Sequence, residues 1–98
     1  MEKRLYEVLL ILPSNLNEEG ILTELAKFDE NVKNLGGNIE KLERQGKRKL
    51  GFNIKKHNDG YFVIAYVTLE VDKVERLKEN CKYADNILRY FVTRKEAA

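Results

Sequence analysis

The residues best suited to a chemical role are the cations between positions 41 and 56. This stretch contains seven basic residues and one acid, Glu43, whereas the formal net charge of the whole chain is only +2. The basic residues are Lys41, Arg44, Lys47, Arg48, Lys49, Lys55 and Lys56. The stretch also has the pattern of a β-strand, and cations fixed along a strand can contact the phosphates that determine affinity and register on a nucleic acid. We therefore predict a nucleic-acid partner.

Lysines on an edge strand also protect a sheet against edge-to-edge pairing. That explanation is sufficient for Lys55 and Lys56, near the expected tip of a hairpin. It is weaker for residues 47–49, since three consecutive cations place charge on both faces of a strand. The residues that we predict to contact phosphate are Lys47, Arg48, Lys49, Arg89, Arg94, Lys3 and Arg4.

Residue types that catalyse reactions are present but not grouped. Ser14 is the only serine and has no neighbouring base. The only cysteine, Cys81, falls on the apolar stripe of a predicted helix, where we expect a buried, unreactive thiol. One histidine and one cysteine do not make a metal site, and no glycine-rich phosphate loop is present. We therefore expect no enzyme activity, no cofactor, no metal and no small-molecule substrate.

The length of 98 residues predicts a single domain, residues 1–98, with residues 95–98 as a frayed end. The lone cysteine excludes an intrachain disulfide and favours a reducing compartment. The apolar run 8–12 is too short for a signal peptide or a membrane span. We expect a cytoplasmic protein with no membrane partner.

The first half of the chain predicts a strand followed by a helix. Residues 5–12 are almost wholly apolar and end at Pro13, which indicates a central strand. Asn15 or Asn17 is the expected helix cap. The apolar residues between positions 21 and 35 then recur every three or four residues, as on one face of a helix, and two glycines follow.

The second half predicts two strands, a helix and a last strand. A strand begins near Asn38 and is interrupted at Gln45–Gly46 by a bulge or bend, and His57–Gly60 has the composition of a hairpin turn. The third strand is expected at 61–69 and the fourth at 86–94. Between them, Asp72 and Glu75 have the spacing of a capping box at the start of a short helix.

The order β-α-β-β-α-β is that of the α+β ferredoxin-like fold, the split βαβ arrangement. Right-handed crossovers place both helices on one face of a four-stranded antiparallel sheet, with the first and third strands in the centre. Strand alternation then places a set of apolar residues on the uncovered face, namely Leu9, Phe62, Ile64 and Tyr66. We predict that they contact a partner protein, although antiparallel sheets often have a modestly apolar exterior without such a role.

Two other functions stay open at this point. Residues 59–66 partly resemble the octapeptide of RNA-recognition modules, which bind single-stranded RNA by stacking. Tyr61 and Tyr66 fit that motif, but Val63 stands where a stacking phenylalanine is needed. The other possibility is a regulatory domain of this topology that binds a small molecule and forms a homodimer through its sheet.

The whole chain, from about residue 3 to residue 95, resembles the bacterial small-subunit ribosomal protein six family in the order and spacing of its motifs. These motifs are Leu5-Tyr6-Glu7, Pro13, Gly37, Gly46-Lys47-Arg48-x-Leu50, Gly60-Tyr61-Phe62 and Asn86-Ile87-Leu88-Arg89. The chain departs from the family pattern at Gly51-Phe52-Asn53, where the family usually has a proline.

The resemblance implies a ferredoxin-like structural protein of the small ribosomal subunit. It also implies two partners, the central domain of the small-subunit ribosomal RNA and the eighteenth small-subunit ribosomal protein. Gly46-Lys47-Arg48 matches the family's basic segment, and Arg89 matches its arginine in the fourth strand.

Overall fold

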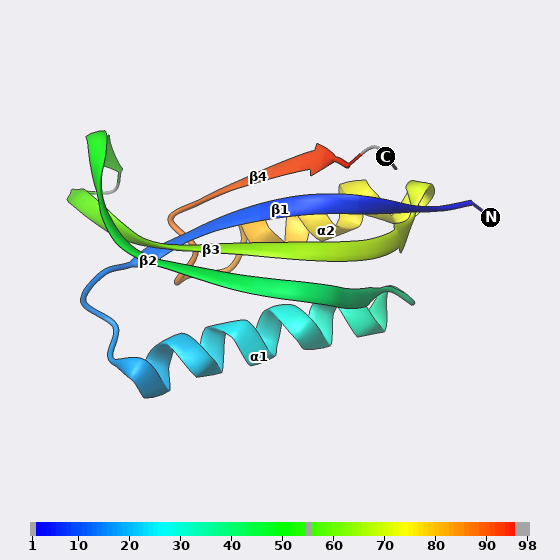
Figure 1. Ribbon diagram of the computed structural model, residues 1–98, viewed down its shortest axis with the longest axis horizontal. Coiled ribbons are helices and arrows are strands. Elements are labelled where there is room, and N and C mark those ends of the chain that lie inside the picture. Colours follow the sequence, from blue (N-terminus) through cyan, green and yellow to red (C-terminus); the bar gives the residue numbers. More distant parts are fainter. Residues whose placement is uncertain (1, 55, 96–98) are drawn as a thin grey trace.

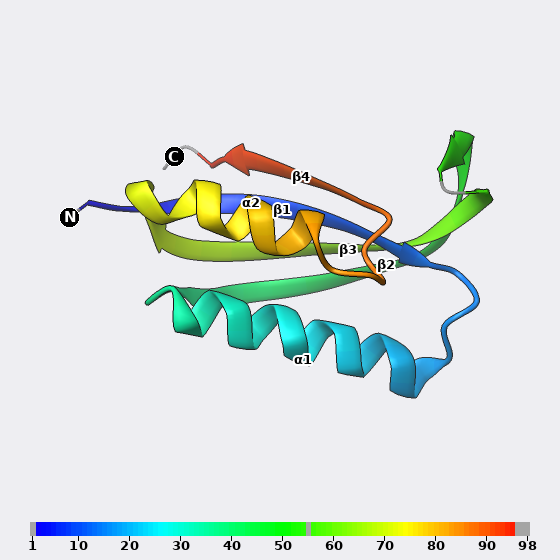
Figure 2. The same ribbon diagram turned by 180° about the vertical axis from the view of Figure 1, so that it is seen from behind.

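The computed structural model describes residues 2–54 and 56–95, without the side chains of residues 52–54. Its elements are β1 (Lys3–Pro13), α1 (Glu18–Asn34), β2 (Asn38–Ile54), β3 (His57–Glu70), the 3₁₀ turn η1 (Val71–Lys73), α2 (Val74–Lys82) and β4 (Arg89–Arg94). The strand order is β2-β3-β1-β4, and every neighbouring pair is antiparallel. Both helices cover one face of the sheet (Figures 1 and 2). The predicted ferredoxin-like fold, with β1 and β3 in the centre, is confirmed.

The core lies between the sheet and the helices, because alternate residues of the central strands point toward the helices. In β1 these residues include Val8, Leu10 and Leu12, and all three are buried. In β3 every second residue from Val63 to Leu69 is fully buried. The intervening residues face the open side of the sheet, where most of them are only half-buried.

The ends of α1 follow local hydrogen-bonding rules. The side chain of Asn17 accepts a hydrogen bond from the Gly20 amide (2.8 Å), so Asn17 and not Asn15 is the cap. Four apolar residues of the helix face the core, Ile21, Leu25, Phe28 and Val32. After the helix, Gly36 adopts a φ of 79°, the left-handed conformation that favours glycine.

The second helix begins differently from the prediction. Asp72 lies inside η1 and no side chain caps α2, so the predicted capping box with Glu75 is wrong. Leu77 and Cys81 are buried against the core, as predicted from their spacing. The fourth strand starts at Arg89, three residues later than expected, because residues 86–88 form the loop that enters it.

The hairpin of β2 and β3 extends beyond the rest of the sheet, and its end bends away from the sheet plane (Figure 1). Ile54 faces His57 across the hairpin and Lys56 has a φ of 69°, so the chain reverses between Ile54 and His57. His57–Gly60 belongs to β3, and the predicted turn at these residues is wrong. Lys55 lies outside the described residues.

The two ends of the described chain lie close together, at the opposite end of the sheet from the hairpin tip (Figure 1). The Lys95 amide donates to the Leu5 carbonyl (2.8 Å), so Lys95 is paired and not frayed. The rest of the predicted frayed end, residues 96–98, lies outside the described residues. No helix within the described ranges is long and apolar enough to cross a membrane.

Candidate nucleic-acid interface

A β-bulge in the edge strand β2 determines which way the basic residues point. Arg44 lies opposite Val63 and Gly46 lies opposite Phe62, so two steps along β2 match one step along β3. Gly46 adopts a φ of 91°, which explains the glycine at this position. The predicted irregularity at Gln45–Gly46 is thereby confirmed. As a result, Arg44 lies on the helix-covered side of the sheet, whereas Gly46 lies on the open side with Phe62.

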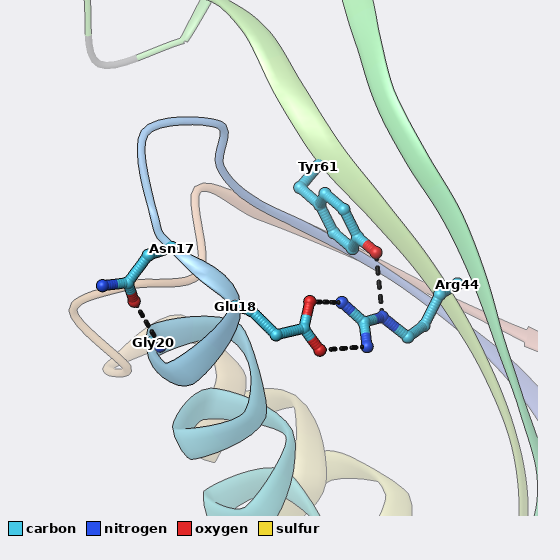
Figure 3. Close-up of polar contacts among 5 residues, drawn as sticks. All are labelled: Asn17, Glu18, Gly20, Arg44 and Tyr61. Atoms are coloured by element: carbon cyan, nitrogen blue, oxygen red, sulfur yellow. Dashed lines mark hydrogen bonds and ion pairs between the residues drawn. The ribbon is translucent and has the colours of Figure 1, made fainter.

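Arg44 is occupied by contacts within the protein. Its two terminal nitrogens donate to the Glu18 carboxylate at 2.7 and 2.6 Å, and its Nε donates to the Tyr61 hydroxyl at 2.8 Å (Figure 3). The hydrogen bonds from Arg44 lower the pKa of Glu18, and those to Glu18 and Tyr61 raise the pKa of Arg44. The pair joins the first turn of α1 to the base of the hairpin. Arg44 therefore acts as a structural link, and its charge is largely compensated.

Lys47, Arg48 and Lys49 differ from Arg44 because their charges are not compensated. All three are exposed, and they lie opposite Tyr61, Gly60 and Asp59 of β3. Among the described residues, none of them forms an ion pair. They therefore form a compact cationic segment on the projecting hairpin.

The Arg48 guanidinium is held in place by neutral groups. It donates to the side-chain oxygen of Gln45 (2.9 Å) and lies 6.0 Å from the centre of the Phe62 ring. A planar cation supported by an aromatic ring keeps its charge and loses less side-chain freedom when it binds a phosphate. Arg48 is thus the best positioned of the predicted phosphate ligands.

Arg89 lies at the same end of the open face as Arg48. In the row of residues that crosses the sheet, Gly46 of β2 is followed by Phe62 of β3, Ile11 of β1 and Arg89 of β4. Since neighbouring strands lie about 4.8 Å apart, about 14 Å separates β2 from β4. Cations from the two edge strands therefore border one apolar strip on the open face.

The other predicted phosphate ligands lie at the far end of the sheet. Lys3 faces Glu70, and Arg4 forms an ion pair with Glu2 at 2.9 Å. Arg94 is exposed opposite Tyr6, about 17 Å along β4 from Arg89 and on the other side of the sheet. The structure therefore groups Lys47, Arg48, Lys49 and Arg89, but places Lys3, Arg4 and Arg94 apart from them.

The predicted protein-contact residues Leu9, Phe62, Ile64 and Tyr66 all lie half-buried on the open face of the sheet. This face is less uniformly apolar than the sequence suggested. The pKa of Tyr66 is raised most by a hydrogen bond to Glu7, and further by burial and by the negative charge of the nearby Glu43. The Nζ atoms of Lys41 and Lys95 lie 6.0 and 5.8 Å from the centre of its ring. Tyr66 is therefore surrounded by charges of both signs.

Part of the open face is covered by the chain itself. Ile11 is only 4% exposed, because Leu88 and the bent hairpin with Leu50 pack against it beside Phe62. Strand alternation places Ile11 on the uncovered face together with Leu9, so this cover could not be predicted from the pattern. Phe91 was not predicted to belong to this face either, although it is 49% exposed and lies opposite Leu9. The alternation of side chains along the fourth strand, which puts Arg89 and Phe91 on the same face, was the signal that could have identified Phe91.

Comparison with known proteins agrees with the fold. The family model for ribosomal protein S6 matches residues 5–94. Small ribosomal subunit protein bS6 of Halalkalibacterium halodurans is 33% identical over 93 residues, covering 95% of this chain and 98% of that protein. The corresponding protein of Clostridium acetobutylicum is 36% identical over 87 residues, covering 89% and 92%.

A solved structure is similar over nearly the whole chain. The crystal structure of 30S ribosomal protein S6 from Thermotoga maritima has a TM-score of 0.87 and 26% sequence identity, covering 96% of this chain and 89% of that one. Sequence and structure thus give the same assignment, and the resemblance seen in the motifs is confirmed. The chain belongs to the ribosomal protein S6 family.

Proposed function

We propose that this protein is a structural component of the small ribosomal subunit in the cytoplasm, and that it binds the central domain of the small-subunit ribosomal RNA together with the eighteenth small-subunit ribosomal protein. The observation that supports RNA binding most directly is the exposed segment Lys47–Lys49 on the projecting hairpin, which lacks ion pairs within the described residues. A rigid support lets such cations contact phosphates in a defined register.

The RNA is held by the hairpin end of the sheet in this proposal. Lys47, Arg48 and Lys49 contact phosphates from β2, and Arg89 contacts them from β4. Lys3, Arg4 and Arg94, at the other end, contribute through their charge or through a separate RNA segment. We propose a structural role without a reaction, in which the residues at this surface neutralise and position phosphates.

The test for the RNA site is the double variant Lys47→Ala/Arg48→Ala. Binding to a central-domain RNA fragment, in the presence of the partner protein, is measured as a function of salt concentration. We expect weaker binding, and a salt dependence of log K shallower by about 1 for each lost phosphate contact. The matched control is Lys33→Ala/Lys78→Ala, which removes the same charge from the two helices. An unchanged affinity and salt slope in the hairpin variant would show that the site is elsewhere.

The partner protein is expected on the open face around Leu9, Ile64 and Tyr66. An apolar strip bordered by charges of both signs offers hydrophobic contact in the centre and polar contacts at its rim. Ile64→Glu places a charge in this strip, whereas Leu22→Glu places the same charge at a 52% exposed position of α1. We expect the first variant, and not the second, to lose the heterodimer in sedimentation. Equal partner binding by both variants contradicts this surface.

The contacts of Tyr61 argue against RNA reading by base stacking. Its hydroxyl accepts the hydrogen bond from Arg44, and its ring packs against the hydrophobic core. A residue held in this way presents no free aromatic face to a base. The geometry therefore favours contacts to the RNA backbone.

A further inference from the structure

A cavity of about 380 Å³ lies between α1 and the C-terminal end of α2, on the side of the sheet away from the open face. Its apolar lining comes from the core residues Phe28, Cys81 and Ile87. Tyr83 forms part of its rim and is 74% exposed. The cavity has no part in the proposed RNA site, because its lining residues come from the helices and the segment after them.

Glu24 lines this cavity and is the only charged residue that is buried within the described ranges, at 8% exposure. Burial of a carboxylate is costly unless strong hydrogen bonds replace its water. The Glu24 carboxylate has two long contacts, both at Oε2: Lys27 Nζ lies 3.4 Å and Asn86 Nδ2 lies 3.3 Å from this oxygen. The other oxygen, Oε1, is left for a further donor. The carboxylate is thus buried and only weakly paired.

The remaining groups of the cavity favour a planar cation. A guanidinium can donate two parallel hydrogen bonds to one carboxylate, and it stacks on aromatic rings. The Tyr83 ring already has one cation beside it, since Lys82 Nζ lies 5.6 Å from the ring centre. Glu30 also lines the cavity, so the two carboxylates of the lining outnumber its one cation, Lys27. This negative balance disfavours a phosphate group, so we do not expect nucleic acid as the ligand.

We propose that this cavity binds an arginine side chain of a basic polypeptide, with the guanidinium on Glu24 and against the Tyr83 ring. The charge of the site is complementary to such a chain, and its apolar lining fits the methylene groups of the arginine. The site is independent of the basic hairpin, so a polypeptide bound here leaves the hairpin and the open face of the sheet accessible.

The experiment uses the isotopically labelled full chain without RNA or partner protein. N-acetyl-arginine amide is titrated, and backbone amide shifts are followed by NMR. Its neutral isostere, N-acetyl-citrulline amide, and N-acetyl-lysine amide are titrated in parallel. We expect saturable shifts around Cys81, Tyr83 and Asn86 with arginine, and affinity at least about tenfold lower with the two other amides. Equal shifts with all three amides, or none that saturate at the cavity, overturn the proposal.

Two variants separate binding from folding. Glu24→Gln keeps an acceptor for Asn86 and should weaken arginine binding about tenfold, whereas Glu19→Gln on the exposed side of α1 should leave it unchanged. Tyr83→Ala changes an exposed residue and therefore keeps the fold, and we expect several-fold weaker binding. Wild-type affinity in Glu24→Gln or in Tyr83→Ala contradicts the proposed site. Because no RNA is present, failure here leaves the proposed ribosomal function untouched.

Discussion

Arg44 and Glu18 face each other fork to fork, with Nη1–Oε2 and Nη2–Oε1 distances of 2.7 and 2.6 Å, although 26 positions separate them in the sequence. This pair connects the start of α1 to the base of the basic hairpin. A second link lies nearby, because the Ser14 hydroxyl donates to Asp59 at 2.6 Å. Glu18 at the start of α1 therefore holds β2, and Ser14 in the segment before α1 holds β3, at the base of the hairpin.

We expect Arg44→Lys to loosen the hairpin base while preserving its charge. Lysine cannot make the two parallel hydrogen bonds to Glu18 together with the one to Tyr61. Hydrogen exchange should become faster for β2 amides around the bulge, and the decrease in Tm should be smaller than that of a core truncation such as Phe28→Ala. Lys73→Arg, an exposed exchange in η1, is the control. Unchanged exchange in Arg44→Lys would show that the link has no mechanical role.

The stability contributed by Glu18 should depend on pH. Its folded-state pKa is lowered by Arg44, so the contribution is present above the unfolded-state pKa and is lost as the pH falls through the folded-state pKa. The Tm difference between wild type and Glu18→Gln should be largest at neutral pH and disappear in acid. Glu19→Gln provides the comparison, since Glu19 lies in the same first turn of α1 without Arg44 as a partner. A difference that persists in strong acid contradicts the assignment.

Gly46→Ala should destabilise the bulge. An alanine at a φ of 91° places its Cβ in a strained conformation that costs about 1–2 kcal/mol, although the space around it is open. Gly51→Ala is the matched control, because a Cβ there also meets nothing and its backbone does not require a glycine. Chemical denaturation of both variants measures the effect. Equal free energies of unfolding would show that backbone strain at position 46 is negligible.

Cys81 should be unreactive in the folded protein. Burial raises the pKa of its thiol to about 12, so almost no nucleophilic thiolate is present at neutral pH. A chromogenic disulfide reagent should modify it at the rate of unfolding, and rapidly in denaturant. Fast modification of the native protein would mean that α2, which carries Cys81, opens far more readily than its packing indicates.

The fold was predictable because hydrophobic periodicity determines which faces are buried. Val8, Leu10 and Leu12 are buried with the alternate residues of β3, as their spacing required. The turn was predicted wrongly because Gly60 has a different role. A Cβ on Gly60 would lie 2.6 Å from Ile11 Cγ2, so this glycine permits close contact between strands. Likewise, Asp59 accepts a hydrogen bond from the Ser14 hydroxyl and does not stabilise a turn.

The candidate site was predictable in part. The exposed cations at 47–49 follow from composition and strand pattern alone. The pairing of Arg44 with Glu18 does not follow from them, because it depends on a bulge that turns the Arg44 side chain toward a helix distant in sequence. The same limit applies to Ile11, which is covered by Leu50 because the hairpin bends and by Leu88 from the loop that enters β4. Local pattern gives the face of a residue, but not the neighbours that three-dimensional packing brings to it.

The register shifts of β2 make its outer edge a poor template for pairing with a second copy of the chain. A straight edge strand would offer a regular ladder of unpaired amide and carbonyl groups to a second molecule. Two shifts, between Ile39 and Lys41 and between Arg44 and Gly46, break that ladder into short pieces. Edge-to-edge pairing through β2 is therefore disfavoured by the backbone itself, in addition to the charge of its lysines.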